Sequence, residues 1–237
     1  AKITASVNKA VIGSGSNSSV IYASITDASG NVWAGTAYIY ATSAASALIA
    51  GSETPSSCSY SSTTGLHACS VTGKTVGTAT FKVIDAATVA TSNVSSDAVS
   101  VAVSVATAAK VTLSFDKATY APGERAVIWA KVVDADGKQI PTTLLNNLFA
   151  TGAVKSNVSL TAVSTNVLTS VSGTVADATD TTTDPNNPTY AGAVTYVVTM
   201  PQASGVVELT ATGGTSLEAA GRVAITASAE VVNDTVT

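Results

Sequence analysis

The sequence contains a long internal repeat, and this repeat constrains the fold more than any other feature. Residues 1–10 align with residues 109–118, and six of these ten positions are identical. Residues 20–23, Val-Ile-Tyr-Ala, align in turn with residues 127–130, Val-Ile-Trp-Ala, so the offset stays at 107 to 108 residues. A repeat of this length has the size of an ordinary domain. The chain is therefore expected to hold two tandem copies of one domain.

The repeat also predicts the limits of the two domains. The first unit is expected at residues 1–108 and the second at residues 109–229, followed by a C-terminal tail at residues 230–237. The second unit carries a polar insertion at residues 177–189 that is rich in Asp, Asn, Thr and Pro. This composition is typical of a long surface loop.

Short segments of alternating apolar and polar residues predict strands in both units. More than a quarter of the chain is Ser or Thr, and Thr and Val favour pleated, half-buried surfaces. Turn residues interrupt these segments at roughly ten-residue intervals, as in a β-sandwich. The predicted fold class is all-β, with two tandem antiparallel sandwiches. Beyond the repeated strands, further strands are expected at residues 34–42, 75–84, 98–105, 158–168, 190–200, 206–211 and 222–228.

One pair of equivalent strands shows which side chains should face the core. Alternation places two equivalent sets inward, namely Ile21, Ala23, Ile25 and Ile128, Ala130, Val132. The same geometry places Tyr22 and Trp129 outward at the same point of each unit. An aromatic side chain held outward in both repeats could contact a neighbouring molecule, or it could be a lone surface aromatic. Tyr22 and Trp129 are therefore the candidates for assembly contacts.

A longer motif in the second unit carries a family resemblance. Tyr120-Ala-Pro122-Gly123 precedes an alternating strand, and that strand ends in Asp134-Ala-Asp-Gly137. This arrangement resembles bacterial Ig-like domains of the invasin and intimin type. The first unit keeps the Asp-x-x-Gly turn but lacks the Pro-Gly turn. The resemblance implies tandem Ig-like sandwiches in a secreted or surface-exposed module, as in adhesins, stalks and surface layers, and it brings no catalytic residues with it.

Cys58 and Cys69 enclose a segment rich in Ser, Thr and Gly. Two buried free thiols or half of a metal site are alternatives, but a metal site would need further Cys or His ligands. The flanking residues favour an exposed hairpin loop closed by a disulfide, which places the protein in an oxidising, extracytoplasmic compartment. The only histidine, His67, lies in this loop. It is expected to be solvent-exposed and to offer no platform for a nucleophilic triad.

Two groups of aspartates are weak calcium candidates, and no other cofactor is expected. Asp134 and Asp136 resemble the opening of a calcium loop, but the further oxygen ligands of such a loop do not follow. A tight turn with a left-handed Gly explains both copies of this motif. The second group, Asp177, Asp180 and Asp184, lies in the polar insertion.

Charge and hydropathy exclude several classes of partner. Eleven basic and fifteen acidic residues give a net charge of −4, and no basic stripe with interleaved aromatics occurs. Nucleic-acid binding is therefore not expected. The longest uncharged stretches alternate like strands and contain many polar residues, so no transmembrane segment is expected.

The leading hypothesis is a non-enzymatic, extracellular structural protein on the bacterial cell surface. Only 11% of the residues are charged, and interfaces tend to exclude charge. This favours a subunit that assembles with copies of itself into a surface layer, sheath or filament. The alternative is a stalk or spacer segment of a cell-surface adhesin, with other surface components or glycans as further partners. A carbohydrate-binding module is a third hypothesis, but the scattered aromatic residues predict no cluster for it.

Overall fold

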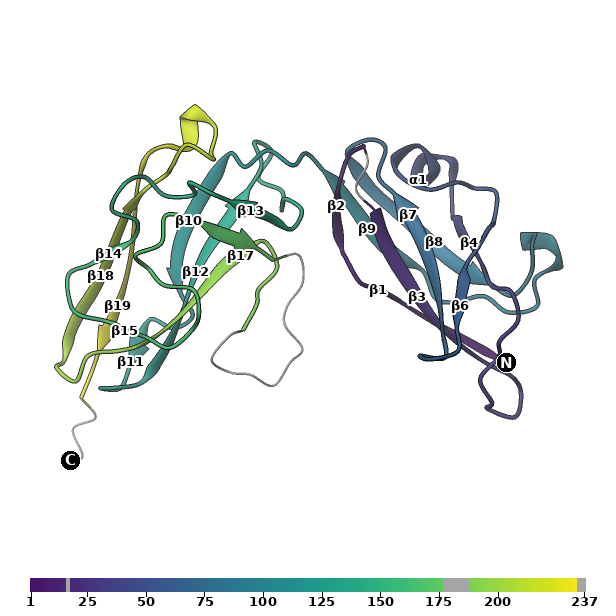
Figure 1. Cartoon of the computed structure of the whole chain (residues 1–237), viewed down its shortest axis with the longest axis horizontal. Coiled ribbons are helices and arrows are strands. Elements are labelled where there is room, and N and C mark those ends of the chain that lie inside the picture. The colour runs from purple at the N-terminus through teal and green to yellow at the C-terminus, as the bar shows by residue number, and fades with distance from the viewer. Residues whose placement is uncertain (16–17, 177–187, 234–237) are drawn as a thin grey trace. The chain divides into compact units, whose positions relative to one another are not determined.

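The computed structural model describes residues 1–15, 18–176 and 188–233 of the chain. It divides the chain into two compact units, Ala1–Ala106 and Thr107–Thr237 (Figure 1). The division lies two residues before the boundary at 108 that the repeat predicts. In the part of the chain described here, no helix is long and apolar enough to cross a membrane.

Unit 1 consists of two sheets. The first has the strand order β1-β3-β7-β6, and the second has the order β2-β9-β8-β4-β5. The strands of unit 1 are β1 (Lys2–Val7), β2 (Val11–Gly13), β3 (Ser18–Thr26), β4 (Tyr38–Ala41), β5 (Ser56–Ser57), β6 (Ser59–Ser61), β7 (Leu66–Thr72), β8 (Gly77–Ile84) and β9 (Val99–Ser104). Neighbouring strands run antiparallel, except that β2 runs parallel to β9.

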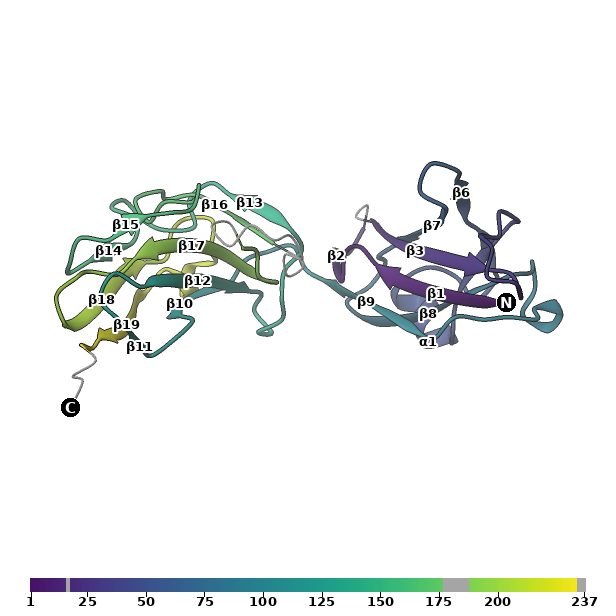
Figure 2. The same cartoon turned by 90° about the horizontal axis from the view of Figure 1, so that it is seen from below.

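Unit 2 also has two main sheets, and in the described residues each of them has four strands. Their strand orders are β10-β12-β17-β15 and β11-β19-β18-β14, and β13 and β16 form a separate two-stranded sheet. The strands of unit 2 are β10 (Lys110–Phe115), β11 (Thr119–Tyr120), β12 (Arg125–Val133), β13 (Thr143–Leu145), β14 (Lys155–Ser156), β15 (Thr161–Ala162), β16 (Gly173–Val175), β17 (Ala193–Thr199), β18 (Gly205–Thr212) and β19 (Ala224–Val231). Figure 2 shows the sheets of each unit from a second direction.

Both units share the way in which the first strand changes sheets. In unit 1, β1 pairs antiparallel with β3, and the chain then crosses so that β2 pairs parallel with the last strand, β9. In unit 2, β10 and β11 do the same with β12 and β19. Two such sheets with a split first strand are the architecture of an Ig-like sandwich. The predicted all-β fold class is therefore confirmed.

Each unit has its own hydrophobic core between its sheets. The six side chains predicted to face inward are all at most 3% exposed, namely Ile21, Ala23, Ile25, Ile128, Ala130 and Val132. Their burial follows from the period-two alternation of strands β3 and β12, which places every second side chain on the same face. The buried Ile and Val side chains of this set contribute roughly 1.5–3 kcal/mol each to folding.

Several element boundaries differ from the sequence prediction. The strand expected at residues 158–168 is reduced to β15, and the rest of that segment is irregular. The last strand, β19, continues to Val231, which is buried, so the predicted tail from residue 230 starts too early. A short helix, α1 (Ala44–Ile49), was not expected. It forms because the Ser43 hydroxyl accepts a hydrogen bond from the Ser46 amide at the start of an alanine-rich turn.

The Tyr120 side chain forms a buried corner at the start of unit 2. Its hydroxyl donates to Asp116 Oδ1 over 2.6 Å and accepts from the Lys117 amide over 3.1 Å. Asp116 Oδ1 also accepts from the Val127 amide at 2.7 Å, which ties the corner to β12. Burial, together with the hydrogen bond to Asp116, raises the pKa of Tyr120 well above its ordinary value. The Tyr-x-Pro-Gly motif thus has a structural role.

Glu124 closes the turn that follows this corner. Its carboxylate accepts from the Ala121 amide at 2.8 Å and forms an ion pair with Lys117. The hydrogen bond from Lys117 lowers the pKa of Glu124, and the Ala121 amide lowers it further. The carboxylate of Glu124 therefore has its partners within the turn and stabilises it.

Candidate functional site

Trp129 lies on the outer face of unit 2, in the middle of strand β12. In the sheet register it stands between Ser114 of β10 and Thr195 of β17. Tyr190, which precedes β17, folds over this face and packs against Trp129, with ring centroids 4.6 Å apart and planes inclined by 52°. Such a tilted pair has the geometry that aromatic quadrupoles favour. The structure therefore brings together two aromatic residues that are far apart in the sequence.

The two rings line a concavity of about 280 Å³ on this face. It is lined by Thr112, Ser114, Trp129, Lys131, Tyr190, Ala191 and Ala193. The two hydroxyl side chains come from β10, and Lys131 supplies the only charge among the described lining residues. The indole Nε1 of Trp129 is shielded from solvent and has no acceptor among the described residues. This concavity combines apolar ring surface with hydroxyl and ammonium donors.

Tyr22 occupies the same position in unit 1, but its surroundings are different. In the register it stands between Ser6 and Ala68, and its side chain is 37% exposed. Among the described residues of unit 1, no ring pairs with Tyr22 in the way that Tyr190 pairs with Trp129. The two candidate contact residues are therefore equivalent in sequence and unequal in structure, because only Trp129 belongs to a concave site.

Cys58 and Cys69 form a disulfide in unit 1. Cys58 stands between β5 and β6, where the chain passes from one sheet to the other, and Cys69 faces it from β7. The two cysteines are 8% and 0% exposed, so the bond lies in the core. Only the turn between β6 and β7 matches the exposed hairpin loop that the sequence predicted. The disulfide therefore fixes the crossing between sheets as well as the hairpin.

The prediction that His67 is solvent-exposed is wrong. Its side chain is fully buried, and its ring packs against Trp33 and Tyr60 with centroids 5.7 and 5.0 Å away. The Nε2–H donates to the Gly35 carbonyl over 2.8 Å. Because a carbonyl can only accept, this contact requires the proton on Nε2. The sequence did contain an indication of this burial, since His67 is two residues before the inward-facing Cys69 on the same strand and therefore lies on the same face.

The Asp134 candidate builds a turn. Its Oδ1 accepts from the amides of Asp136 and Lys138 at 3.0 and 2.8 Å, and Gly137 adopts a left-handed conformation. Asp27 does the same in unit 1, where the hydrogen bond from the Asn31 amide is the main cause of its lowered pKa. Aspartates at this position favour turns because the carboxylate accepts from the backbone two residues on.

The structure gives little support to the remaining calcium candidates. Asp136 is exposed. Over the described ranges, no three His, Cys, Asp or Glu residues lie close enough together to hold a metal ion. Asp177, Asp180 and Asp184 lie outside the described residues.

Another turn of unit 1 is organised by Asp85. Its Oδ1 accepts from the Ser92 hydroxyl at 2.8 Å and from the Asn93 and Val94 amides at 3.0 and 3.2 Å. Partial burial raises the pKa of Asp85, but these three hydrogen bonds outweigh it and leave the pKa below its ordinary value. The carboxylate is thus satisfied within the loop that leads from β8 to β9.

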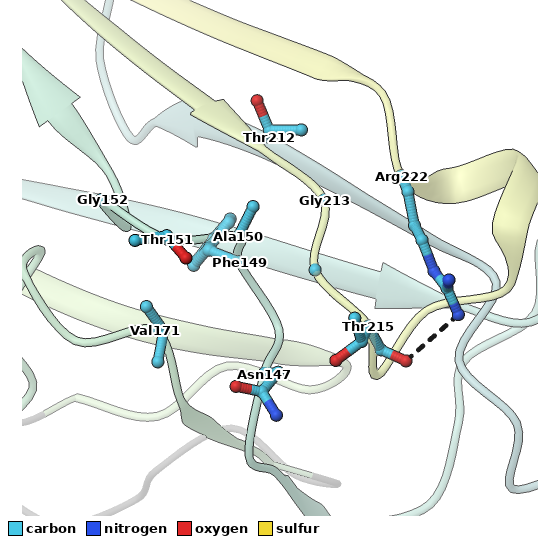
Figure 3. Close-up of a pocket in the computed structure, with 11 residues that line it drawn as sticks. Asn147, Phe149, Ala150, Thr151, Gly152, Val171, Thr212, Gly213, Thr215 and Arg222 are labelled. Atoms are coloured by element: carbon cyan, nitrogen blue, oxygen red, sulfur yellow. Dashed lines mark hydrogen bonds between the residues drawn. The ribbon is translucent and has the colours of Figure 1, made fainter.

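A second, larger concavity of unit 2 has a volume of about 620 Å³ (Figure 3). It is lined by Asn147, Phe149, Ala150, Thr151, Gly152, Val171, Thr212, Gly213, Gly214, Thr215 and Arg222. The Arg222 guanidinium already donates to the carbonyls of Leu217 and Thr215, at 3.0 and 3.4 Å. A Cβ at Gly214 would lie 2.2 Å from the Asn147 carbonyl oxygen. This concavity is therefore shaped by close packing of backbone, and the Trp129 concavity is the better candidate site.

Comparison with solved structures finds similar folds in bacterial proteins. The chain is similar to the Yersinia pseudotuberculosis adhesin InvE, with 14% identity and a TM-score of 0.32, over 97% of this chain and 58% of that chain. It is similar to the Escherichia coli adhesin FdeC, with 14% identity and a TM-score of 0.33, over 98% and 63% of the two chains. A glycosyl hydrolase family 2 member from Bacteroides cellulosilyticus gives 13% identity and a TM-score of 0.44, over 91% and 23%.

The chain thus spans about six tenths of the two adhesin structures and about a quarter of the hydrolase. At these identities the likeness concerns the fold. The sequence matches no protein-family model and no curated protein.

Proposed function

We propose that this chain is a stalk or spacer segment of a bacterial cell-surface protein of the adhesin kind, and that it carries no catalytic activity of its own. The tandem of two sandwiches with the same topology and separate cores supports this function. Repeated autonomous domains add length without needing a shared site. The resemblance of the Tyr-x-Pro-Gly motif to invasin and intimin Ig-like domains points to the same role.

The strand edges of the four main sheets carry the proposal. Six of their eight edge strands have only two or three residues in the described part of the chain, namely β2, β5, β6, β11, β14 and β15. The other two, β1 and β10, have six residues each, and each begins with an exposed lysine. Short edges and edge lysines are two of the devices by which soluble proteins prevent strand pairing between molecules. These edges favour a spacer over a subunit that pairs through its strands.

The disulfide supports an extracytoplasmic location. Disulfides persist in oxidising compartments and are rare in a reducing cytoplasm. Protease treatment of intact bacteria, followed by mass spectrometry, tests the location. We expect peptides of this chain in the released fraction, with the peptides of Cys58 and Cys69 still joined. Release only after lysis, with both thiols free, would contradict the proposal.

A subunit of a surface lattice is the second candidate. The observation that favours it is the small share of charged residues, 11% of the chain, because protein interfaces tend to exclude charge. In such a lattice the two longer edges, β1 and β10, would be the contacts. The concentration dependence of the molecular mass separates the two candidates.

A further inference from the structure

We propose that the Trp129 concavity is a saccharide-binding site that accepts a pyranose ring and prefers a sugar carrying a carboxylate. This inference concerns a ligand, and it stands whether the chain is a spacer or a lattice subunit. The site is built from one face of the β10-β12-β17 sheet together with the segment that leads into β17.

The chemistry of the lining matches the two kinds of surface on a pyranose. One face of the ring presents C–H groups, which carry partial positive charge and pack well on the negative face of an aromatic ring. Trp129 and Tyr190 are the aromatic residues that line the concavity. The ring edge presents hydroxyls, and the Thr112 and Ser114 side chains line the same concavity with groups that both donate and accept hydrogen bonds.

The size and polarity of the concavity disfavour larger apolar occupants. Its volume of about 280 Å³ is at the lower limit of pockets that hold drug-sized ligands, so it suits one or two sugar rings. A purely apolar side chain would cover the hydroxyls of Thr112 and Ser114 without a partner, which costs free energy. A saccharide can satisfy them.

The charge of the site gives the preference for an acidic sugar. Lys131 is exposed, and its ammonium is the only charged group among the lining residues that the structure describes. No carboxylate of the described residues lines the concavity, although the chain as a whole carries a net charge of −4. A carboxylate on the sugar would pair with Lys131, and such a charge-assisted hydrogen bond is stronger than a neutral one.

The rival explanation is that Tyr190 only anchors the start of β17 by packing on Trp129. Unit 1 supplies the comparison, because Tyr22 stands at the equivalent position and no second ring of the described part of the chain pairs with it. If the ring pair serves only the fold, saccharides should affect neither unit. If it forms a site, adding a saccharide should change the signal of Trp129 and leave the aromatic residues of unit 1 unaffected.

Nuclear magnetic resonance of the full chain tests the proposal directly. The chain has two tryptophans, Trp33 in unit 1 and Trp129 in unit 2, so a ¹H–¹⁵N spectrum shows two indole N–H signals, which Trp129→Phe assigns. The probes are tri-galacturonate as the acidic saccharide and cellotriose as the neutral one. We expect saturable shifts of the Trp129 signal alone, with tri-galacturonate binding more tightly. No saturable shift with either probe would overturn the site.

Variants then separate binding from folding. Tyr190→Ala should weaken tri-galacturonate binding by about tenfold, while Tyr22→Ala should leave it unchanged. Lys131→Gln should abolish the preference for the acidic probe, and Lys9→Gln, at an exposed lysine of unit 1, should not. The backbone signals of each variant report whether unit 2 is folded. Unchanged affinity in a folded Tyr190→Ala, or equal affinity of the original chain for both probes, would contradict the assigned roles.

Discussion

Replacing Tyr120 by Phe tests whether the buried corner of unit 2 depends on a single hydroxyl. The ring is 1% exposed and stays buried in the variant, so the change removes the hydrogen bonds and leaves the packing. Two bonds are lost, the one donated to the Asp116 carboxylate over 2.6 Å and the weaker one accepted from the Lys117 amide over 3.1 Å. A hydrogen bond to a charged group contributes roughly 1.5–3 kcal/mol, so we expect a loss of about 2 kcal/mol. For a domain of this size, that lowers the urea midpoint by about 1 M.

Tyr196 supplies a matched control in the same unit. Its side chain is also 1% exposed, but its hydroxyl has no hydrogen-bond partner within the described ranges. Burial alone raises the pKa of this group. Removing an unsatisfied buried hydroxyl removes a desolvation cost, so Tyr196→Phe should leave unit 2 unchanged or more stable. The two variants delete the same atom from equally buried rings, so the changes that they cause in the stability of unit 2 should differ in sign or size.

The assay follows both units in one titration. The indole signals of Trp33 and Trp129 disappear as units 1 and 2 unfold in urea, so each unit reports its own midpoint. Tyr120→Phe should lower the Trp129 midpoint and leave the Trp33 midpoint in place. An equal loss in Tyr120→Phe and Tyr196→Phe would refute the corner argument. A parallel shift of the Trp33 signal would refute the independence of the two units.

Three further predictions use the same titration. Replacing Cys58 and Cys69 together by Ala should destabilise unit 1 by roughly 3 kcal/mol, since the closed loop is short, and should spare unit 2; a loss shared by both units would contradict this. Gly214→Ala should destabilise unit 2 by about 1–3 kcal/mol, because its Cβ would meet backbone oxygen; an unchanged Trp129 midpoint would refute the close approach. The lowered pKa of Asp85 means that its contribution is present above the unfolded-state pKa and is lost as pH falls through the folded-state pKa. The urea midpoint of unit 1 should therefore decrease when the pH is lowered below about 4, and Asp85→Asn should make this decrease smaller. If the variant has the same pH profile as the original chain, the role of this carboxylate is refuted.

The repeat and the period-two alternation were enough to predict the architecture. They identified two tandem all-β units and the inward side chains of β3 and β12, because burial on one face of a strand leaves a direct trace in the sequence. In the irregular segment after β14, the sequence pattern was misleading. Its alternating Val and Leu residues suggested a strand at 158–168, but only two residues pair with β17.

The candidate site could be predicted only in part. Alternation correctly placed Trp129 outward, but the same alternation over 190–200 would put Tyr190 on the core face with Val194. Gly192 adopts a φ of 75° and breaks the alternation, so Tyr190 turns to the outer face. The aromatic residues are scattered in the sequence and predict no carbohydrate-binding cluster, but this turn brings two of them together. His67 was misplaced for a different reason, because the surrounding Ser, Thr and Gly residues outweighed the strand pattern.

The molecular mass in solution tests the central claim, that the chain is a spacer whose sheet edges do not pair with other molecules. Sedimentation equilibrium should be run on the full, oxidised chain from micromolar to millimolar concentration, with and without calcium. We predict a mass of 23.4 kDa throughout, that of one chain. A mass that rises with concentration, or ordered sheets or filaments in electron micrographs of the same samples, would contradict the spacer and favour the lattice subunit.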